Sequence, residues 1–273
     1  MFHVEHRRMD YHLHTNHSMD GRQTMPELCE TMMARGVQEI ALTEHIEPGH
    51  PEEEMDVPPV WADWFAEIAR CRAAYPALII RSGIEIGDNP LCRAETKALL
   101  DTLPLDFRLL SLHLVNGVDC YDSEKYFTGK TRAQAYREYA EAKAESILDW
   151  EDFDSVAHIG YVAKFSIYTG KERALVYEDA PDAFDAIFRH VIALGKCIEV
   201  NTSGYATTGD TFAHSSLIRR YIELGGEKFT FGSDSHDTVR DYADVERAKE
   251  MVRALGGKYQ VSFEGRKAIY WKI

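Results

Sequence analysis

Seven short apolar segments alternate with segments of helical periodicity along this chain of 273 residues. Each apolar segment has the length of a β-strand, and together they cover residues 8–14, 38–45, 78–86, 107–113, 154–158, 196–201 and 228–233. A strand followed by a helix, repeated along the chain, is typical of parallel strands joined by crossover helices. The pattern therefore predicts an α/β fold.

The helical segments carry recognisable start and stop signals. In the clearest one, 25–35, apolar side chains recur at the three- and four-residue spacing of a single helix face. Thr24 and Glu27 form a capping box, Pro26 suits the first turn, and Gly36 ends the segment. We expect further helices over 61–75, 91–101, 131–148, 179–194, 214–224 and 240–255.

Two observations bear on the choice between an open doubly wound sheet and a closed barrel. No G-x-G-x-x-G motif follows the first strand, so the main argument for a dinucleotide-binding fold is missing. Histidines and carboxylates end nearly every strand, and a barrel gathers all strand ends on one face whereas an open sheet offers one crevice. We expect a TIM-like barrel, with its active site at the C-terminal face, in a single domain over residues 1–273.

Three connections are longer than the two to six residues usual in such folds. They cover residues 46–60, 114–130 and 159–177. Long connections without secondary structure of their own are uncommon unless they have a use. We expect these three to form lids or specificity walls over the site, except for the acidic run 52–54, which we expect to be solvated surface.

Composition limits the partners of the chain. A net charge of −14 without a lysine or arginine cluster argues against nucleic-acid binding, which needs a basic face. Five cysteines, none in a C-x-x-C pair, indicate a reducing compartment and argue against a thiolate zinc site. No segment resembles a signal peptide or a membrane span. We expect a soluble, cytoplasmic protein, and the sequence leaves its oligomeric state open.

Residues that bind divalent cations fall at the ends of the predicted strands. They are His12, His14, His45, Glu85, His113, His158, Asp234 and His236. A single histidine at such a place is more often structural, but six at the same end of successive strands, with two carboxylates, predict a metal site. Imidazole and carboxylate ligands without thiolate suit zinc, iron or manganese, and the sequence does not choose among them.

Six motifs at the strand ends form a set: HLHT (12–15), TEHIE (43–47), GIE (83–85), SLH (111–113), AHIG (157–160) and GSDSH (232–236). The set resembles the polymerase and histidinol phosphatase (PHP) family over essentially the whole chain. EVNTSG at 199–204 and the overall length are most similar to the histidinol-phosphate phosphatase branch of that family.

The resemblance implies a distorted seven-stranded (βα)7 barrel that holds three divalent metal ions. Ligands of the first ion would be His12, His14, Glu85 and Asp234. The second ion would share Glu85 and add His113 and His158. The third would take His45, His236 and one residue from the loop after the first strand, for which the family spacing indicates Asp20 and His17 is the alternative.

The resemblance also implies a metal-dependent phosphatase. We hypothesise that a hydroxide bridging the first two ions attacks a phosphate monoester. Lys164 is the candidate basic side chain for the charge of the transferred phosphoryl group, and Asp234 is a candidate proton relay as well as a ligand. Asn201, Ser203 and His17 are the other candidate substrate-binding residues.

The family branch implies L-histidinol phosphate, an intermediate of histidine biosynthesis, as the substrate. Another small phosphate ester or a mononucleotide is the alternative, and a metal-binding module without activity is disfavoured because every ligand position carries a ligating residue. The ammonium group of L-histidinol phosphate calls for an acidic partner. Glu44, Glu47 and Asp119 are candidates, and the sequence does not select among them.

Overall fold

Parallel strands form the centre of the computed structural model, which describes residues 2–3, 6–239 and 242–273. These strands are β2 (Met9–Leu13), β3 (Glu39–Ile46), β4 (Ile79–Gly87), β5 (Phe107–Ser111), β8 (Ser155–Val156), β9 (Cys197–Asn201) and β10 (Lys228–Gly232). Every neighbouring pair in this series is parallel. Each strand overlaps the apolar segment that predicted it, so the α/β fold is confirmed.

The sheet itself differs from the closed seven-stranded barrel that the sequence suggested. In the described part of the chain it has ten strands, in the order β1-β12-β11-β10-β9-β8-β5-β4-β3-β2. The additional strands are β1 (Phe2–His3), β11 (Tyr259–Glu264) and β12 (Lys267–Lys272). Strands β2 and β10 stand at different places in this order and do not pair as a ladder, so the sheet is not closed.

The C-terminal hairpin β11–β12 explains why closure fails. Tyr259 pairs with Lys228, so β11 occupies the free edge of β10 where that strand begins. Near their carboxyl ends β10 and β2 are linked by the backbone, where Leu13 and Ser235 form an isolated bridge and the Asp234 N–H donates to the His12 carbonyl at 2.9 Å. The hairpin thus separates the two strands at one end, while the backbone holds them together at the end where the histidines lie.

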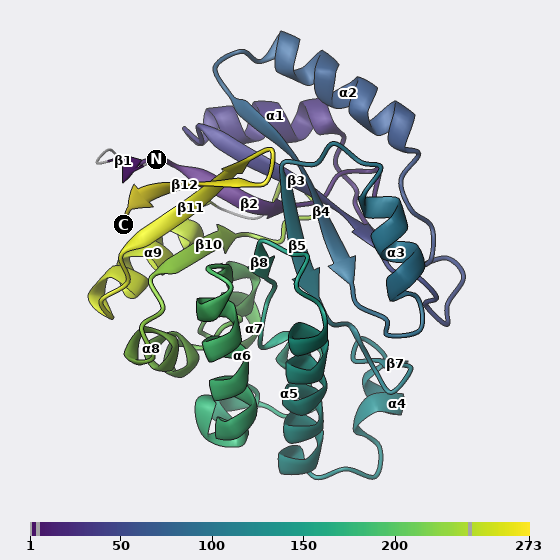
Figure 1. The fold of residues 1–273 in the computed structure, drawn as a ribbon, viewed down its shortest axis with the longest axis vertical. Coiled ribbons are helices and arrows are strands. Elements are labelled where there is room, and N and C mark those ends of the chain that lie inside the picture. Colours follow the sequence, from purple (N-terminus) through teal and green to yellow (C-terminus); the bar gives the residue numbers. More distant parts are fainter. Residues whose placement is uncertain (1, 4–5, 240–241) are drawn as a thin grey trace.

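Helices surround the sheet on its outside (Figure 1). Their bounds are α1 (Met25–Ala34), α2 (Trp61–Ala74), α3 (Arg93–Leu100), α4 (Ser123–Phe127), α5 (Arg132–Asp149), α6 (Pro181–Ala193), α7 (Tyr205–Thr208), α8 (Ser215–Glu223) and α9 (Ala243–Ala254). Thr24 forms the expected capping box with Glu27 at the start of α1. Residues 240–241, at the start of the predicted helix 240–255, lie outside the described residues.

Apolar packing leaves one end of the sheet for polar side chains. A large core cluster contains buried residues of the helices, such as Trp64 and Phe188, and of the strands. A second cluster contains the rings of Tyr11, Phe107 and Phe263, and the Phe107 ring centroid lies 5.2 Å from that of Tyr11 and 5.1 Å from that of Phe263. These rings fill the interior on the side of β11, so the space above the opposite strand ends remains for the histidines.

The helices of the described residues are too short or too polar to cross a bilayer.

A separate two-stranded sheet, β6 (Leu114–Val115) with β7 (Val118–Asp119), lies in the long connection after β5. Together with α4 it gives the predicted loop 114–130 a defined structure. This connection carries Asp119, which lines the pocket described below.

Candidate active site

Six buried or nearly buried histidines meet at the carboxyl ends of the parallel strands. The ring of His14 stacks against two others, with centroid distances of 4.2 Å to His45 and 4.1 Å to His236. The His113 ring centroid lies 5.3 Å from that of His158, and that of His12 lies 5.0 Å from that of His14. All six histidines predicted from the sequence therefore belong to one cluster.

Glu85, on β4, stands at the centre of the cluster and is fully buried. Its Oε2 lies 3.0 Å from His12 Nε2, and its Oε1 lies 2.7 Å from His158 Nε2. Ser111 on the next strand donates a hydrogen bond to Oε1. Imidazole nitrogens of three further histidines lie within 3.2 to 3.5 Å of this carboxylate, those of His14, His45 and His113.

The donor set fits divalent cations. Ligand atoms gather within 4.8 Å of one another in four groups: His14–His45–His236, His12–Glu85–His158, His12–His14–Asp234 and His45–Glu47–His113. His14 Nε2 and His45 Nδ1 are buried yet make no hydrogen bond with a described residue. Buried polar nitrogens are rarely left without a partner, and neutral imidazole nitrogens bind zinc and similar metals.

The protonation of these groups follows from burial and from their neighbours. Burial lowers the pKa of His158 to about 3. Burial and the neighbouring His236 and His45 hold the pKa of His14 well below its usual value. Burial alone would raise the pKa of Glu85, but His12 and the histidines beside it hold it well below its ordinary value. Burial would also lower the pKa of His45 and His113, but the neighbouring Glu85 and Glu47 raise it to about 9 and about 10. Because ligating imidazoles must be neutral, binding of a cation at these two histidines would release protons.

Two carboxylates that were not assigned this role from the sequence orient the histidines from behind. Glu199 Oε1 lies 2.6 Å from His12 Nδ1, which turns His12 Nε2 towards Glu85. Glu47 Oε1 lies 2.7 Å from His113 Nδ1. Such partners fix the ring orientation and the tautomer of a ligating histidine. The sequence signal for Glu199 is its place on a buried strand two residues before Asn201, on the same face.

Two glycines make room for these carboxylates. A Cβ atom on Gly232 would lie 2.3 Å from His12 Cβ and 2.4 Å from Glu199 Oε1. A Cβ atom on Gly87 would lie 1.9 Å from Glu47 Oε2. The absence of a side chain at both positions therefore allows the orienting carboxylates to reach the histidines.

Asp234 lies two residues beyond the end of β10 and lines the pocket. Its backbone φ is 55°, in the left-handed region that aspartate tolerates better than most residues. Lys164 Nζ lies 3.1 Å from Asp234 Oδ2, and Ser203 Oγ lies 3.3 Å from the same oxygen. Burial would raise the pKa of Asp234, but Lys164 and then His12 hold it well below its usual range.

The structure separates the two candidates for the remaining ligand. Asp20 Oδ2 lies 3.0 Å from His236 Nε2, and Asp20 Oδ1 lies 3.7 Å from His45 Nε2. His17 instead places its Nε2 2.7 Å from Glu67 Oε2, on α2. Asp20 lines the pocket and His17 is absent from its lining. The geometry thus brings Asp20, and not His17, to the cluster.

Asn201 and Ser203 lie behind the floor of the site. Asn201 Nδ2 donates to Glu199 Oε2 at 3.2 Å, and Asn201 Oδ1 accepts from Ser203 at 2.6 Å. Both residues are buried, and neither lines the pocket. In this arrangement they support Glu199 and Asp234, whereas the sequence had suggested them for direct contact with a substrate.

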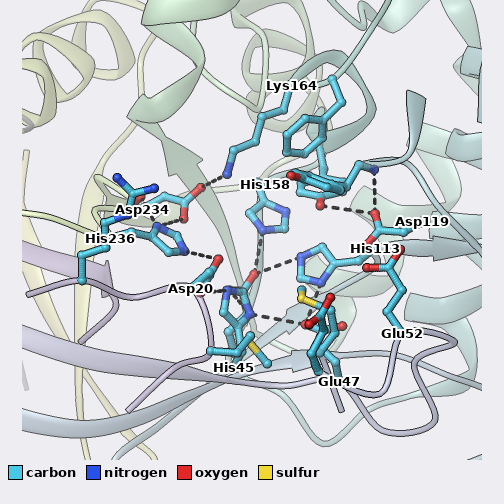
Figure 2. A pocket seen from close by; sticks show the side chains of 18 of the residues that line it. Asp20, His45, Glu47, Glu52, His113, Asp119, His158, Lys164, Asp234 and His236 are labelled. Carbon is cyan, nitrogen blue, oxygen red and sulfur yellow. Dashed lines mark hydrogen bonds and ion pairs between the residues drawn. The ribbon is translucent and has the colours of Figure 1, made fainter. Parts of the chain in front are cut away.

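The cluster forms the floor of a cavity of about 650 Å³ (Figure 2). All three long connections contribute to its walls, as the sequence predicted: 46–60 through Glu47 and Met55, 114–130 through Asp119 and Tyr121, and 159–177 through Tyr161, Lys164 and Phe165. Glu52 and Glu54, expected to be surface alone, are exposed and also line the pocket. The cationic side chains in the lining are Lys164 and Arg22. Arg22 was not singled out from the sequence, since nothing in its local pattern marks it.

Fold and site together define an α/β protein with a buried, histidine-rich centre whose donor groups fit divalent cations. The PHP domain model matches residues 10–203, and the chain belongs to the PHP family. A histidinol-phosphatase of Lactococcus lactis is 28% identical over 262 residues, which cover 96% of each chain. A probable histidinol-phosphatase of Clostridium acetobutylicum is also 28% identical, over 83% of this chain and 86% of that protein.

Solved structures of the same kind are similar in fold. The crystal structure of the Lactococcus lactis histidinol phosphate phosphatase, in complex with zinc, L-histidinol and phosphate, matches with a TM-score of 0.89 and 27% identity. This match covers 96% of this chain and 98% of that one. A putative histidinol phosphatase from Listeria monocytogenes, 21% identical, matches with a TM-score of 0.71 over 86% of this chain and 99% of that one and shares the fold.

Proposed function

We propose that this chain is a metal-dependent phosphomonoesterase that hydrolyses L-histidinol phosphate to L-histidinol and phosphate. The proposal is carried by one observation: six clustered imidazoles surround the carboxylates of Glu85 and Asp234, and four of these imidazoles line a pocket together with both carboxylates and Lys164. Similarity to the Lactococcus lactis histidinol-phosphatase over 96% of both chains supports the choice of substrate.

Three divalent cations would occupy the centre. We assign His12, His14, Glu85 and Asp234 to the first, Glu85, His113 and His158 to the second, and Asp20, His45 and His236 to the third. Zinc, iron and manganese suit these donors, and the zinc bound by the Lactococcus lactis protein supports zinc. When bound, such cations lower the pKa of water and neutralise phosphate charge.

The chain's own groups would bind and orient the ester. Lys164 and Arg22 supply positive charge to a dianionic phosphate in a pocket that is otherwise rich in carboxylates. The Lys164 side chain is 25% exposed, and its Nζ lies 3.1 Å from Asp234 Oδ2. The pair can therefore share a proton between the lysine amine and the aspartate carboxylate at the base of the pocket. We assign Asn201 and Ser203 the role of supporting this floor, and we assign His17 no contact with the substrate.

The experiment is a phosphate-release screen with metal-loaded protein over small monoesters, including L-histidinol phosphate and mononucleotides. We expect L-histidinol phosphate to have the highest kcat/KM. A preference of about a hundredfold for another ester, roughly 2.7 kcal/mol in transition-state binding, would contradict the substrate assignment. Elemental analysis of the same preparation counts the bound ions and identifies the metal.

We further propose that residues 1–273 act as one domain. Strand β1 pairs with β12, so the two ends of the chain belong to the same sheet. The net charge of −14 argues against a nucleic-acid substrate. Limited proteolysis that yields one resistant species of nearly full length would support the single domain.

A further inference from the structure

Asp119 is a buried carboxylate in the pocket wall that lacks a cationic partner. It ends β7, its side chain is 10% exposed, and it lines the pocket. Its Oδ1 accepts a hydrogen bond from the Tyr121 backbone N–H at 2.7 Å and faces the Tyr161 hydroxyl at 3.5 Å. No lysine or arginine in the described residues forms an ion pair with it. A buried charge without a counter-charge is costly, which indicates that something else supplies the cation.

His50 does not supply that positive charge. Its Nδ1 accepts a hydrogen bond from the Glu52 backbone N–H at 3.1 Å, so Nδ1 carries a lone pair. The ring proton must then be on Nε2, which lies 3.1 Å from Asp119 Oδ2 and donates to it. His50 therefore donates from Nε2 to Asp119 Oδ2 and fixes the position of this carboxylate.

The other acidic candidates near the site are already engaged. Glu44 accepts hydrogen bonds from Thr15 and Ser18 and does not line the pocket. Glu47 is engaged by two of the clustered histidines, with its Oε1 2.7 Å from His113 Nδ1 and 3.3 Å from His45 Nδ1. Of the three carboxylates that the sequence left open, Asp119 alone both lines the pocket and, within the described residues, forms no hydrogen bond or ion pair with the clustered histidines.

The pocket is electrically asymmetric. Lys164, Asp234 and His236 lie on one side, and Asp119 and Glu52 lie on the other, across the histidine floor (Figure 2). Two aromatic rings, those of Tyr121 and Phe165, line the same pocket as Asp119, and their centroids are 4.9 Å apart. A ligand that is anionic at one end and carries a cation and an aromatic ring at the other complements both sides.

We infer that Asp119, positioned by His50, binds the primary ammonium group of the leaving alcohol and so determines specificity for an amino alcohol phosphate. The inference rests on the proposed function and refines its substrate recognition. A primary ammonium donates three hydrogen bonds, and a buried carboxylate is a suitable acceptor for one of them. The phosphate would then point towards Lys164 and the floor.

The test compares two esters on metal-loaded Asp119→Asn and wild-type protein. One is L-histidinol phosphate, and the other is 3-(imidazol-4-yl)propyl phosphate, which lacks only the amino group. We expect the substitution to lower kcat/KM for L-histidinol phosphate by about 10- to 100-fold and to leave kcat/KM for the second ester within about threefold. The second ester also shows, in the same preparation, that the fold and the metal centre are intact.

Asp122→Asn is the matched control, because Asp122 lies three residues further along, caps α4 and does not line the pocket. Asparagine also caps helices, so this variant should keep the wild-type preference between the two esters. Equal losses on both esters in Asp119→Asn, or no loss on either, would overturn the inference.

Binding of L-histidinol, measured by calorimetry, tests the inference independently of turnover. We expect Asp119→Asn to weaken this binding by about tenfold or more relative to wild type. Equal affinities in the two proteins would overturn the role of Asp119. Failure of wild-type protein to hydrolyse either ester would instead contradict the proposed function, and the calorimetric comparison would still decide whether Asp119 binds the ammonium group.

Discussion

Glu199 Oε1 and His12 Nδ1 are 2.6 Å apart, although 187 residues separate them in the chain. Both side chains are buried, and the same glutamate accepts the backbone N–H of His158 through Oε2 at 2.8 Å. One carboxylate therefore orients residues from β2 and from the segment after β8. The relationship predicts that metal binding depends on Glu199, which does not itself line the pocket.

Glu199→Gln should weaken metal binding by about 10- to 100-fold, because an amide is a poorer acceptor for the ring proton of His12. Competition with a chelator, followed by metal analysis, measures the change. Glu250→Gln on the exposed side of α9 is the matched control and should bind metal like wild type. Unchanged metal affinity in Glu199→Gln would show that His12 is oriented by other contacts.

His158→Ala should reduce turnover by more than about a hundredfold while the protein stays folded. Turnover should fall because His158 Nε2, 2.7 Å from Oε1 of the central Glu85, is an assigned metal ligand. The fold should survive because the substitution removes little apolar packing. Phosphate release and far-UV circular dichroism, measured together, separate loss of activity from loss of structure. Near-normal turnover would refute the assignment of His158 as a ligand.

Lys164→Met should lower kcat/KM for phosphate esters by about a hundredfold, because a charge-stabilising donor is removed beside Asp234. Steady-state kinetics provide the measurement. Lys171→Met, in the same connection but exposed, is the control and should change kcat/KM little. Comparable effects of the two substitutions would indicate a general electrostatic contribution and not a specific one.

Gly232→Ala should destabilise the fold by about 1–3 kcal/mol, because the new Cβ would collide with His12 and Glu199. Denaturant unfolding of metal-free protein measures this effect. Gly160→Ala is the control, since a Cβ there would meet Phe212 at an ordinary distance of 3.6 Å. Equal stabilities of the two variants would show that the strand ends can move apart without cost.

Lys143→Met should stabilise the metal-free protein at pH 7. Lys143 is fully buried on α5, its Nζ makes no hydrogen bond with a described residue, and burial lowers its pKa from 10.5 to about 8. Because the folded pKa lies below the unfolded one, the unfolded chain binds more protons between these values, and stability rises with pH across that window. The buried ammonium thus costs stability at pH 7.

We expect the substitution to raise the free energy of unfolding by about 1–3 kcal/mol at pH 7, with a smaller gain at pH 9.5. Urea unfolding at both pH values measures the difference. Equal gains at the two pH values would mean that the effect comes from packing, and a loss at pH 7 would mean that the ammonium has a stabilising partner.

Local pattern determined much of this protein. Apolar segments of strand length located all seven central strands, and the Thr24 capping box is present where helix α1 begins. The histidines at the strand ends meet because parallel strands direct their carboxyl ends to one side. The strands and the helix starts depend on interactions within a segment, so a single sequence carries them, and the alternation of strands with helices implies the parallel arrangement that brings the histidines together.

Tertiary structure decided what depends on contacts between distant segments. The position of hairpin β11–β12 along β10 determined that the sheet stays open. The contacts of Glu199 with His12, of Asp20 with His236, and of His17 with Glu67 depend on which side chains the loops bring together. Asp119 could be chosen over Glu44 and Glu47 as the candidate ammonium-binding carboxylate only from the pocket lining and from the hydrogen bonds of the three side chains. No periodicity encodes such pairings, because their energies arise only when the whole chain has packed.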